Sequence, residues 1–320
     1  MKSPMLSRKE KWKNILRLAW PLIIANSFWN LQLTIDRIFL SNHSTESLGA
    51  AMAVMGVFWV PMALLQQTAG YVTTFVAQYF GSQEKHMIGP SVWQSIYLSL
   101  GGGILFLGLI FCSRKLFFMM NHSPNITELE ILYFNSLAYS ALPTALVAVA
   151  SGFFTGLGNT KTVMAINAVG LVVNALLDYA MISGHWGFPA MGIQGAGYAT
   201  ALAGFASALF GLALVFTRKH DRAYQLFSGW IPNRNLLKRF LRFGIPSGLQ
   251  WALEGMAFTV FLILIGRFES GDAALASSSI AVTVMMLAVL PALGVAQAVM
   301  VLVGQHLGEK TRTARTSSME

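Results

Sequence analysis

The chain has 320 residues, of which 55% are hydrophobic and 11% are Asp, Glu, Lys or Arg. Soluble domains carry about 25% charged residues, so this composition excludes an ordinary globular domain. The net charge is +9, but the basic residues lie in short segments between long apolar runs, which argues against a nucleic-acid partner.

Eight apolar runs reach the length of about 18 residues or more that is typical of helices crossing a bilayer. The first run follows a basic N-terminal segment and is too long for the core of a cleaved signal peptide, so we expect a retained helix. The sequence therefore predicts an all-α membrane protein. The expected spans are Leu16–Leu40, Leu48–Val76, Val92–Cys112, Ile131–Phe154, Val163–Ile182, Ile193–Phe216, Phe240–Ile265 and Ala273–Val303.

The longest polar connection follows the sixth span and divides the chain. We expect a six-helix N-terminal lobe at residues 1–217, a cytoplasmic linker at 218–239, and two further spans with a tail at 240–320. If the N-terminus is inside, eighteen of the 22 Lys and Arg residues fall in cytoplasmic segments. This bias predicts a multi-pass protein of the inner (plasma) membrane with both termini in the cytoplasm.

Spans 7 and 8 repeat features of spans 1 and 2. Segment 17–21 shares Arg-x-x-x-Pro with segment 242–246, and segment 78–81 shares Gln-x-x-Gly with segment 305–308. Six spans separate the copies, so the repeats are parallel, which is an established design of transporters. We expect a chain that ends after two helices of a second six-helix unit, with those two helices packed loosely beside the first lobe.

Three carboxylates fall inside the expected spans, namely Asp36, Asp178 and Glu254. An acid at the centre of a membrane helix costs about 2.5–3.5 kcal/mol on insertion scales, so these residues are functional candidates. Asn174 lies one helical turn before Asp178 and shares its helix face. This pair offers oxygen ligands to a small cation, or a carboxyl group that takes up and releases a proton, or a polar cluster that joins helices.

Other residue patterns do not predict catalysis. The single cysteine, Cys112, excludes an internal disulfide, and the six His residues lack the spacing of metal ligands. No phosphate-binding loop or nucleophile elbow is present. We therefore expect no enzyme activity, no cofactor and no metal site. Pro21 and Pro246 each remove a backbone donor near one end of a span, where each is either a bend that moves during transport or a static kink.

Six groups of motifs, four in or entering spans 1, 5, 6 and 7 and two directly after spans 2 and 4, occur in a characteristic order. They are Trp20-Pro21 with Thr34-Ile35-Asp36, Ala77-Gln78-x-x-Gly81, Gly156-x-Gly158-Asn159-Thr160-Lys161, Asn174-x-x-x-Asp178, Gly192-x-x-Gly195-Ala196-x-x-Ala199-Thr200, and Gly244-x-Pro246 with Glu254. In this order and spacing, the chain resembles the multidrug and toxic compound extrusion (MATE) family of secondary transporters over residues 16–310.

The resemblance implies a fold of two six-helix lobes around a V-shaped cleft, of which this chain would hold eight helices. It also implies alternating-access export of cationic, lipophilic compounds in exchange for Na⁺ or H⁺. The residues that match the family's N-lobe cation site are Asp36, Asn174, Asp178 and Thr200. Glu254 matches a span 7 glutamate that is implicated in some branches, and Pro21 matches a bend in span 1.

Two other interpretations remain open. Related folds flip lipid-linked saccharides, although such proteins line the cleft with several cations, whereas acids dominate here. An accessory or inactive membrane protein is the other alternative, and the absence of four family spans favours it. In the preferred interpretation the partners are a cationic small molecule and the bilayer, and the protein is a monomer.

Overall fold

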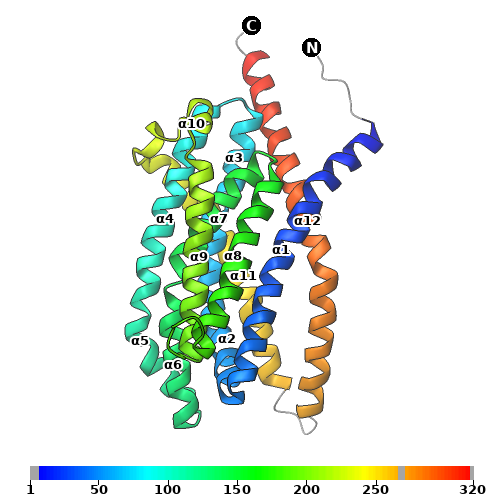
Figure 1. Cartoon of the computed structure of the whole chain (residues 1–320). Helices are drawn as coiled ribbons and strands as arrows, with labels where there is room; N and C mark the ends of the chain where they lie inside the picture. The colour runs from blue at the N-terminus through cyan, green and yellow to red at the C-terminus, as the bar shows by residue number, and fades with distance from the viewer. Residues whose placement is uncertain (1–6, 266–270, 318–320) are drawn as a thin grey trace.

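A computed structural model describes residues 7–265 and 271–317, and the regular structure of these residues is helical (Figure 1). The helices are α1 Arg8–His43, α2 Thr45–Gly70, α3 Val72–Gly81, η1 Lys85–Met87, α4 Ile88–Gly108, α5 Ile110–Phe118, α6 Pro124–Ala138, α7 Ala141–Gly156, α8 Thr160–Ser183, α9 Ile193–Val215, α10 Arg218–Tyr224, η2 Ser228–Trp230, α11 Arg234–Ile265 and α12 Gly271–Ser317.

Eight crossings result when consecutive helices are joined, because α2 continues into α3, α4 bends by 45° into α5, and α6 bends by 40° into α7. Among the described residues, four helical stretches are long and apolar enough to span a membrane, and each bent pair adds one more. α1 and α11 have 36 and 32 residues, long enough to cross, but polar side chains such as Asp36 and Glu254 interrupt them. The predicted all-helical, eight-span architecture is confirmed.

The start of α1 lies several residues before the predicted span because of a local cap. The backbone N–H of Ser7 donates to the Glu10 carboxylate at 2.8 Å, and the Glu10 N–H donates to the Ser7 hydroxyl at 3.3 Å. The hydrogen bond from the Ser7 backbone N–H holds the pKa of the Glu10 carboxylate below its ordinary value, and the Ser7 hydroxyl lowers it further. The cap extends α1 beyond the bundle, and Figure 1 shows this end leaning away from the other helices.

The two helices of the second unit pack on the first two spans. α11 lies along α2, while α12 lies along α1 and α3, and within the described residues α11 and α12 have little contact with each other. Gly248 of α11 approaches the Leu64 carbonyl, and Gly294 of α12 approaches Ile23. Gly248 is the counterpart of Ile23 at the offset of 225, so matching positions of spans 1 and 7 each contact the second span of the other unit.

The repeated Gln-x-x-Gly motifs meet where α3 crosses α12. A Cβ atom at Gly81 would overlap the carbonyl of Gln305, and one at Gly308 would overlap the carbonyl of Gln78. The Gln305 side chain also donates to the Gly156 carbonyl at 2.9 Å. The expectation that spans 7 and 8 pack loosely is therefore wrong at these crossings, because glycine lets the backbones touch.

Both ends of the described chain lie at one end of the bundle, together with α10 (Figure 1). The short turn between α1 and α2 lies at the other end. This sidedness agrees with the charge-based topology, in which the N-terminus, the linker and the tail share a compartment.

Candidate functional site

The candidate site lies inside the first six spans, where α1 packs along α8. Asp36 of α1 is buried, and Asn174 and Asp178 of α8 are fully buried. The spacing of four residues places Asn174 above Asp178 on the face of α8 that meets α1. The structure therefore brings together the span 1 acid and the span 5 pair, as the sequence predicted.

One amide links the two carboxylates. In the orientation that satisfies its surroundings, the Asn174 amide nitrogen donates to Asp36 Oδ1 at 2.9 Å and to Asp178 Oδ2 at 3.3 Å. Because one amide nitrogen reaches both, the two carboxyl groups are close neighbours. Asp178 Oδ1 is buried and has no hydrogen-bond partner in the described residues. This oxygen is the free acceptor of the cluster.

Tyr133 of α6 is a buried polar side chain that the sequence analysis did not single out. It is only 1% exposed. Nothing in its sequence surroundings distinguishes it from the other aromatic residues of apolar helices. Its burial depends on the packing of α6 in the bundle, which a single sequence does not display.

Two predicted site residues do not join the carboxylate cluster. Thr200 of α9 is half-buried and donates its hydroxyl to the Ala196 carbonyl of its own helix at 3.0 Å, and no hydrogen bond within the described residues links it to either acid. Glu254 is exposed on α11, which packs on α2. The structure therefore supports a group of two acids and one amide.

The two proline positions differ in their environment. Pro21 is buried within α1, and Pro246 is exposed within α11. Both helices continue without a break through the proline. Their roles as moving bends remain predictions.

Glu130 lies in a helix, although the sequence analysis placed it outside the spans. The sequence placed only three acids inside spans, but Glu130 is fully buried on α6, where His122 Nδ1 lies 2.7 Å from Glu130 Oε1. Glu130 Oε2 has no hydrogen-bond partner in the described residues. The error arose because the span was predicted to begin at Ile131, one residue later, whereas α6 begins at Pro124.

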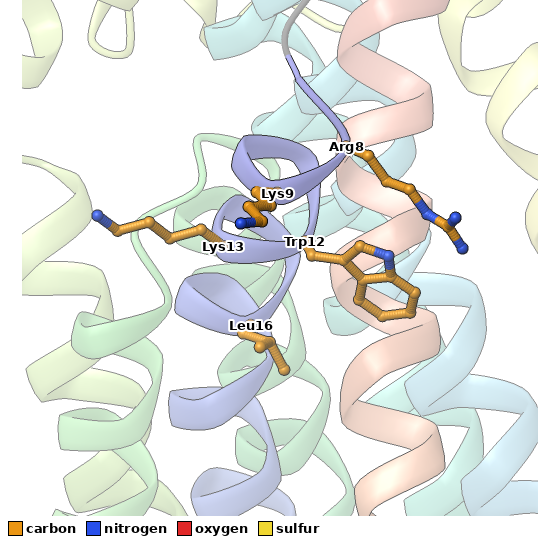
Figure 2. Close-up of a pocket in the computed structure, with 5 residues that line it drawn as sticks. All are labelled: Arg8, Lys9, Trp12, Lys13 and Leu16. Atoms are coloured by element: carbon orange, nitrogen blue, oxygen red, sulfur yellow. The ribbon is translucent and has the colours of Figure 1, made fainter.

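A depression on the described surface lies away from these acids. It has a volume of about 620 Å³ and flanks the first turns of α1. Figure 2 shows Arg8 and Trp12 pointing to one side of the helix and Lys13 to the other. Leu16 is twenty residues from Asp36, about 30 Å along the helix. This open, basic surface is therefore separate from the candidate site.

Two neighbouring carboxyl groups in a buried site cannot both carry a negative charge without compensation. A proton or a small cation bound between them removes this repulsion, and the free Asp178 oxygen provides a ligand for either. The chemistry of the cluster is thus reversible binding of a positive charge inside a helix bundle.

The comparison with protein families agrees with this geometry. The MatE family model matches residues 21–180 and 246–319. The chain belongs to the MatE family. It is therefore a MATE transporter-family protein and not a member of an enzyme family, as the sequence predicted.

The relatives share its sequence over most of its length. The probable multidrug resistance protein NorM of Thermotoga maritima is 29% identical over 303 residues, which are 92% of this chain and 63% of that protein. The multidrug resistance protein PmpM of Pseudomonas aeruginosa is 31% identical over 299 residues, which are 92% of this chain and 62% of that protein.

A solved structure has the same fold. It is described as an outward-facing conformation of a multidrug resistance MATE family transporter of the MOP superfamily, and it matches with a TM-score of 0.84 and 28% identity. The match covers 93% of this MATE chain and 65% of that structure. The chain thus spans slightly less than two thirds of the length of the relatives it matches.

Proposed function

We propose that this MATE protein takes part in secondary multidrug efflux, in which cationic lipophilic compounds leave the cell in exchange for Na⁺ or H⁺. The observation that carries this proposal is the buried cluster of Asp36, Asn174 and Asp178 with a free carboxylate oxygen. The similarity to proteins described as multidrug resistance proteins supports the substrate class.

In this proposal the cluster is the coupling site of the first lobe. A bound cation joins the α1 carboxylate to the α8 carboxylate, so it stabilises the arrangement in which α1 packs closely on α8. Export needs only that the cation and the substrate prefer different arrangements of the protein. Thr200 is proposed to contribute an oxygen when α9 approaches, and Pro21 to act as the bend that lets α1 move.

We propose a role for each of the three segments that the repeat defines. Residues 1–217 are proposed to form the cation-binding lobe, 218–239 a cytoplasmic linker, and 240–320 the start of a second lobe that carries Glu254 and Pro246. We propose a monomer in the inner membrane with both termini in the cytoplasm, as the distribution of Lys and Arg favours.

The test is cation-dependent stability of the purified full chain and its Asp178→Asn variant. Melting temperature is measured against Na⁺ concentration at fixed pH, with K⁺ as the comparison, and against pH at fixed Na⁺. We expect a rise of several degrees in the parent with the coupling ion and none in Asp178→Asn, because the amide keeps the shape but cannot compensate a cation. Reconstituted liposomes loaded with ethidium then report ion-driven transport.

Glu46→Gln is the matched control, since it removes an exposed carboxylate at the start of α2. It should leave the response unchanged. A response that survives in Asp178→Asn would remove the cluster from the coupling mechanism. A parent chain that binds neither ion and moves no ethidium would favour the accessory or inactive alternative.

A further inference from the structure

The linker between the sixth and seventh spans does not project freely into water. Its residues 217–235, here called the interfacial strap, fold back along the outer side of α4. Trp93 donates its indole N–H to the Leu226 carbonyl at 2.6 Å, and Tyr97 donates its hydroxyl to the Trp230 carbonyl. Leu226 is fully buried in the core. The strap is therefore attached to the lobe through specific side chains.

Two glycines allow this close attachment. A Cβ atom at Gly89 would overlap the Gln225 carbonyl, and one at Gly229 would lie 2.7 Å from the backbone nitrogen of Pro90. Within the strap, the Phe227 N–H donates to the Asp221 carboxylate at 2.7 Å. These contacts fix the backbone of the strap, and therefore also the positions of its outward-pointing side chains.

The position of these contacts along α4 gives the depth of the strap. Tyr97 is nine residues after the start of α4 at Ile88, about 13 Å along the helix axis. The exposed apolar surface of α4 begins one turn later, at Leu100, and continues at Ile104 and Leu105. Irregular backbone at membrane depth requires satisfied carbonyls, and the bonds from Trp93 and Tyr97 satisfy two of them.

The outward side of the strap has the composition of a membrane–water boundary. Phe227, Trp230 and Ile231 are 52%, 57% and 64% exposed. Tryptophan favours this level of a bilayer because its ring is apolar and its N–H is polar. A depression of about 380 Å³ lies beside them, lined by Pro90, Ser228, Gly229, Ile231, Pro232, Asn233, Arg234 and Asn235.

The strap and the residues that follow it are rich in positive charge, and Arg234 lines the same depression as Ile231. Residues 217–239 hold six Lys and Arg residues and one Asp. Arg222 and Arg234 are exposed, and within the described part of the chain neither forms an ion pair with a carboxylate. Unpaired basic side chains beside inserted aromatic rings match an anionic lipid surface in charge and in polarity.

We propose that the interfacial strap is a binding site for anionic phospholipid in the leaflet on the side of the chain termini. Trp230 and Ile231 insert beside the acyl chains, and Arg222 and Arg234 bind the head-group phosphate. Tyr97 is a positioning residue that holds the strap at this depth. This inference concerns the lipid environment of the protein and does not depend on cation coupling.

Insertion is tested with a bimane label on the full chain in vesicles of phosphatidylcholine and phosphatidylglycerol. Cys112→Ser removes the native thiol, and Ile231→Cys places the label on the strap. His86→Cys is the control, because His86 is exposed on η1 at the same end of the bundle. We expect nitroxide lipids to quench the Ile231 label several-fold more than aqueous iodide does, with the reverse order at His86. Quenching of both labels by iodide alone would overturn the proposal.

Head-group recognition is tested by comparing spin-labelled phosphatidylglycerol with spin-labelled phosphatidylcholine as quenchers of the same label. We expect at least a two-fold preference for the anionic lipid, lost in Arg222→Gln/Arg234→Gln and retained in Lys9→Gln/Lys161→Gln, which removes two charges elsewhere. Arg222→Lys/Arg234→Lys should keep the preference and excludes a folding defect. Equal quenching by both lipids in the parent, or a preference that survives in the Gln variant, would refute the site.

Discussion

Two acid–base pairs near the turn between α5 and α6 differ in their exposure to solvent. Glu130 is fully buried and contacts His122 at 2.7 Å, whereas Arg114 and Glu128 form an exposed ion pair at 3.2 Å. An exposed ion pair contributes about 0–1 kcal/mol, while a buried polar group that loses its partner costs about 1–3 kcal/mol. The buried pair can therefore be tested by substitution, with the exposed pair in the same region as the control.

The His122→Ala variant is expected to lower the free energy of unfolding by about 1–3 kcal/mol, because Glu130 would keep no partner for either oxygen. The Arg114→Ala variant should change it by less than about 1 kcal/mol. The measurement is denaturant unfolding in detergent micelles. Equal effects of the two substitutions would show that the buried contact contributes no more than the surface pair.

The acids of the candidate site could be predicted from sequence because a charge in an apolar run is conspicuous. Asp36 and Asp178 stand out for that reason, and the spacing of four residues adds Asn174. The burial of Tyr133 could not be predicted, since aromatic residues are common in apolar helices and only the packing of α6 buries this one. Glu130 was missed because the limit of its helix was misplaced by a few residues.

The crossing of α3 and α12 shows how a repeat in sequence becomes a contact between elements. The sequence supplied the Gln-x-x-Gly motifs and their parallel orientation, but it could not show that the two copies touch. The bends between α4 and α5 and between α6 and α7 were also not predicted. No proline marks the first break, which follows from packing within the bundle. Pro143 marks the second break, because it lies in the first turn of α7 and removes the backbone donor that would pair with the Tyr139 carbonyl.

The Gly81→Ala and Gly308→Ala variants are expected to separate α3 from α12, because a methyl group at either position overlaps a backbone carbonyl of the other helix. Alanine is intrinsically favoured over glycine in a helix by about 1 kcal/mol, so any loss of stability comes from the contact. The measurement is melting temperature together with disulfide cross-linking between cysteines placed on the two helices, in a Cys112→Ser background.

Gly56→Ala and Gly101→Ala are the controls for that experiment. Both glycines lie inside helices, and a Cβ atom at either meets nothing within 4 Å. These variants should be as stable as the parent or slightly more stable. If Gly81→Ala behaves in the same way, the crossing tolerates separation and does not hold the two units together.

At the scale of the whole molecule, the predicted orientation rests on charge. Both ends of the described chain and α10 lie at one end of the bundle (Figure 1), which is the side to which the sequence-based count assigns eighteen of the 22 Lys and Arg residues. Green fluorescent protein fused after Glu320 is expected to fluoresce in bacterial cells, because it folds in the cytoplasm, while alkaline phosphatase fused there should be inactive. The opposite pair of results would invert the topology and place the interfacial strap in the outer leaflet.

Polar and aromatic side chains gather where the two units face each other. Asn26 of α1 donates to Gln297 of α12 at 3.3 Å, and the rings of Trp29 and Trp59 lie 6.3 Å apart. Gly255 of α11 lies against the Trp59 ring, which places the neighbouring Glu254 close to this surface. An acid that faced lipid there would cost about 2.5–3.5 kcal/mol, so we expect Glu254 to face water or protein.

Labelling kinetics test this expectation in a Cys112→Ser background. Glu254→Cys should react with a membrane-impermeant maleimide at a rate near that of Lys161→Cys, an exposed position in the first turn of α8. Leu105 of α4 is apolar and 77% exposed on the surface of the bundle. Leu105→Cys should react far more slowly, because lipid covers this position. If Glu254→Cys reacts as slowly as Leu105→Cys, Glu254 is shielded from water. The Trp59→Ala variant, which opens the neighbouring surface, then distinguishes two cases. Faster labelling of Glu254→Cys in that variant would indicate burial against protein. An unchanged slow rate would place Glu254 in lipid and remove it from any water-filled pathway between the two units.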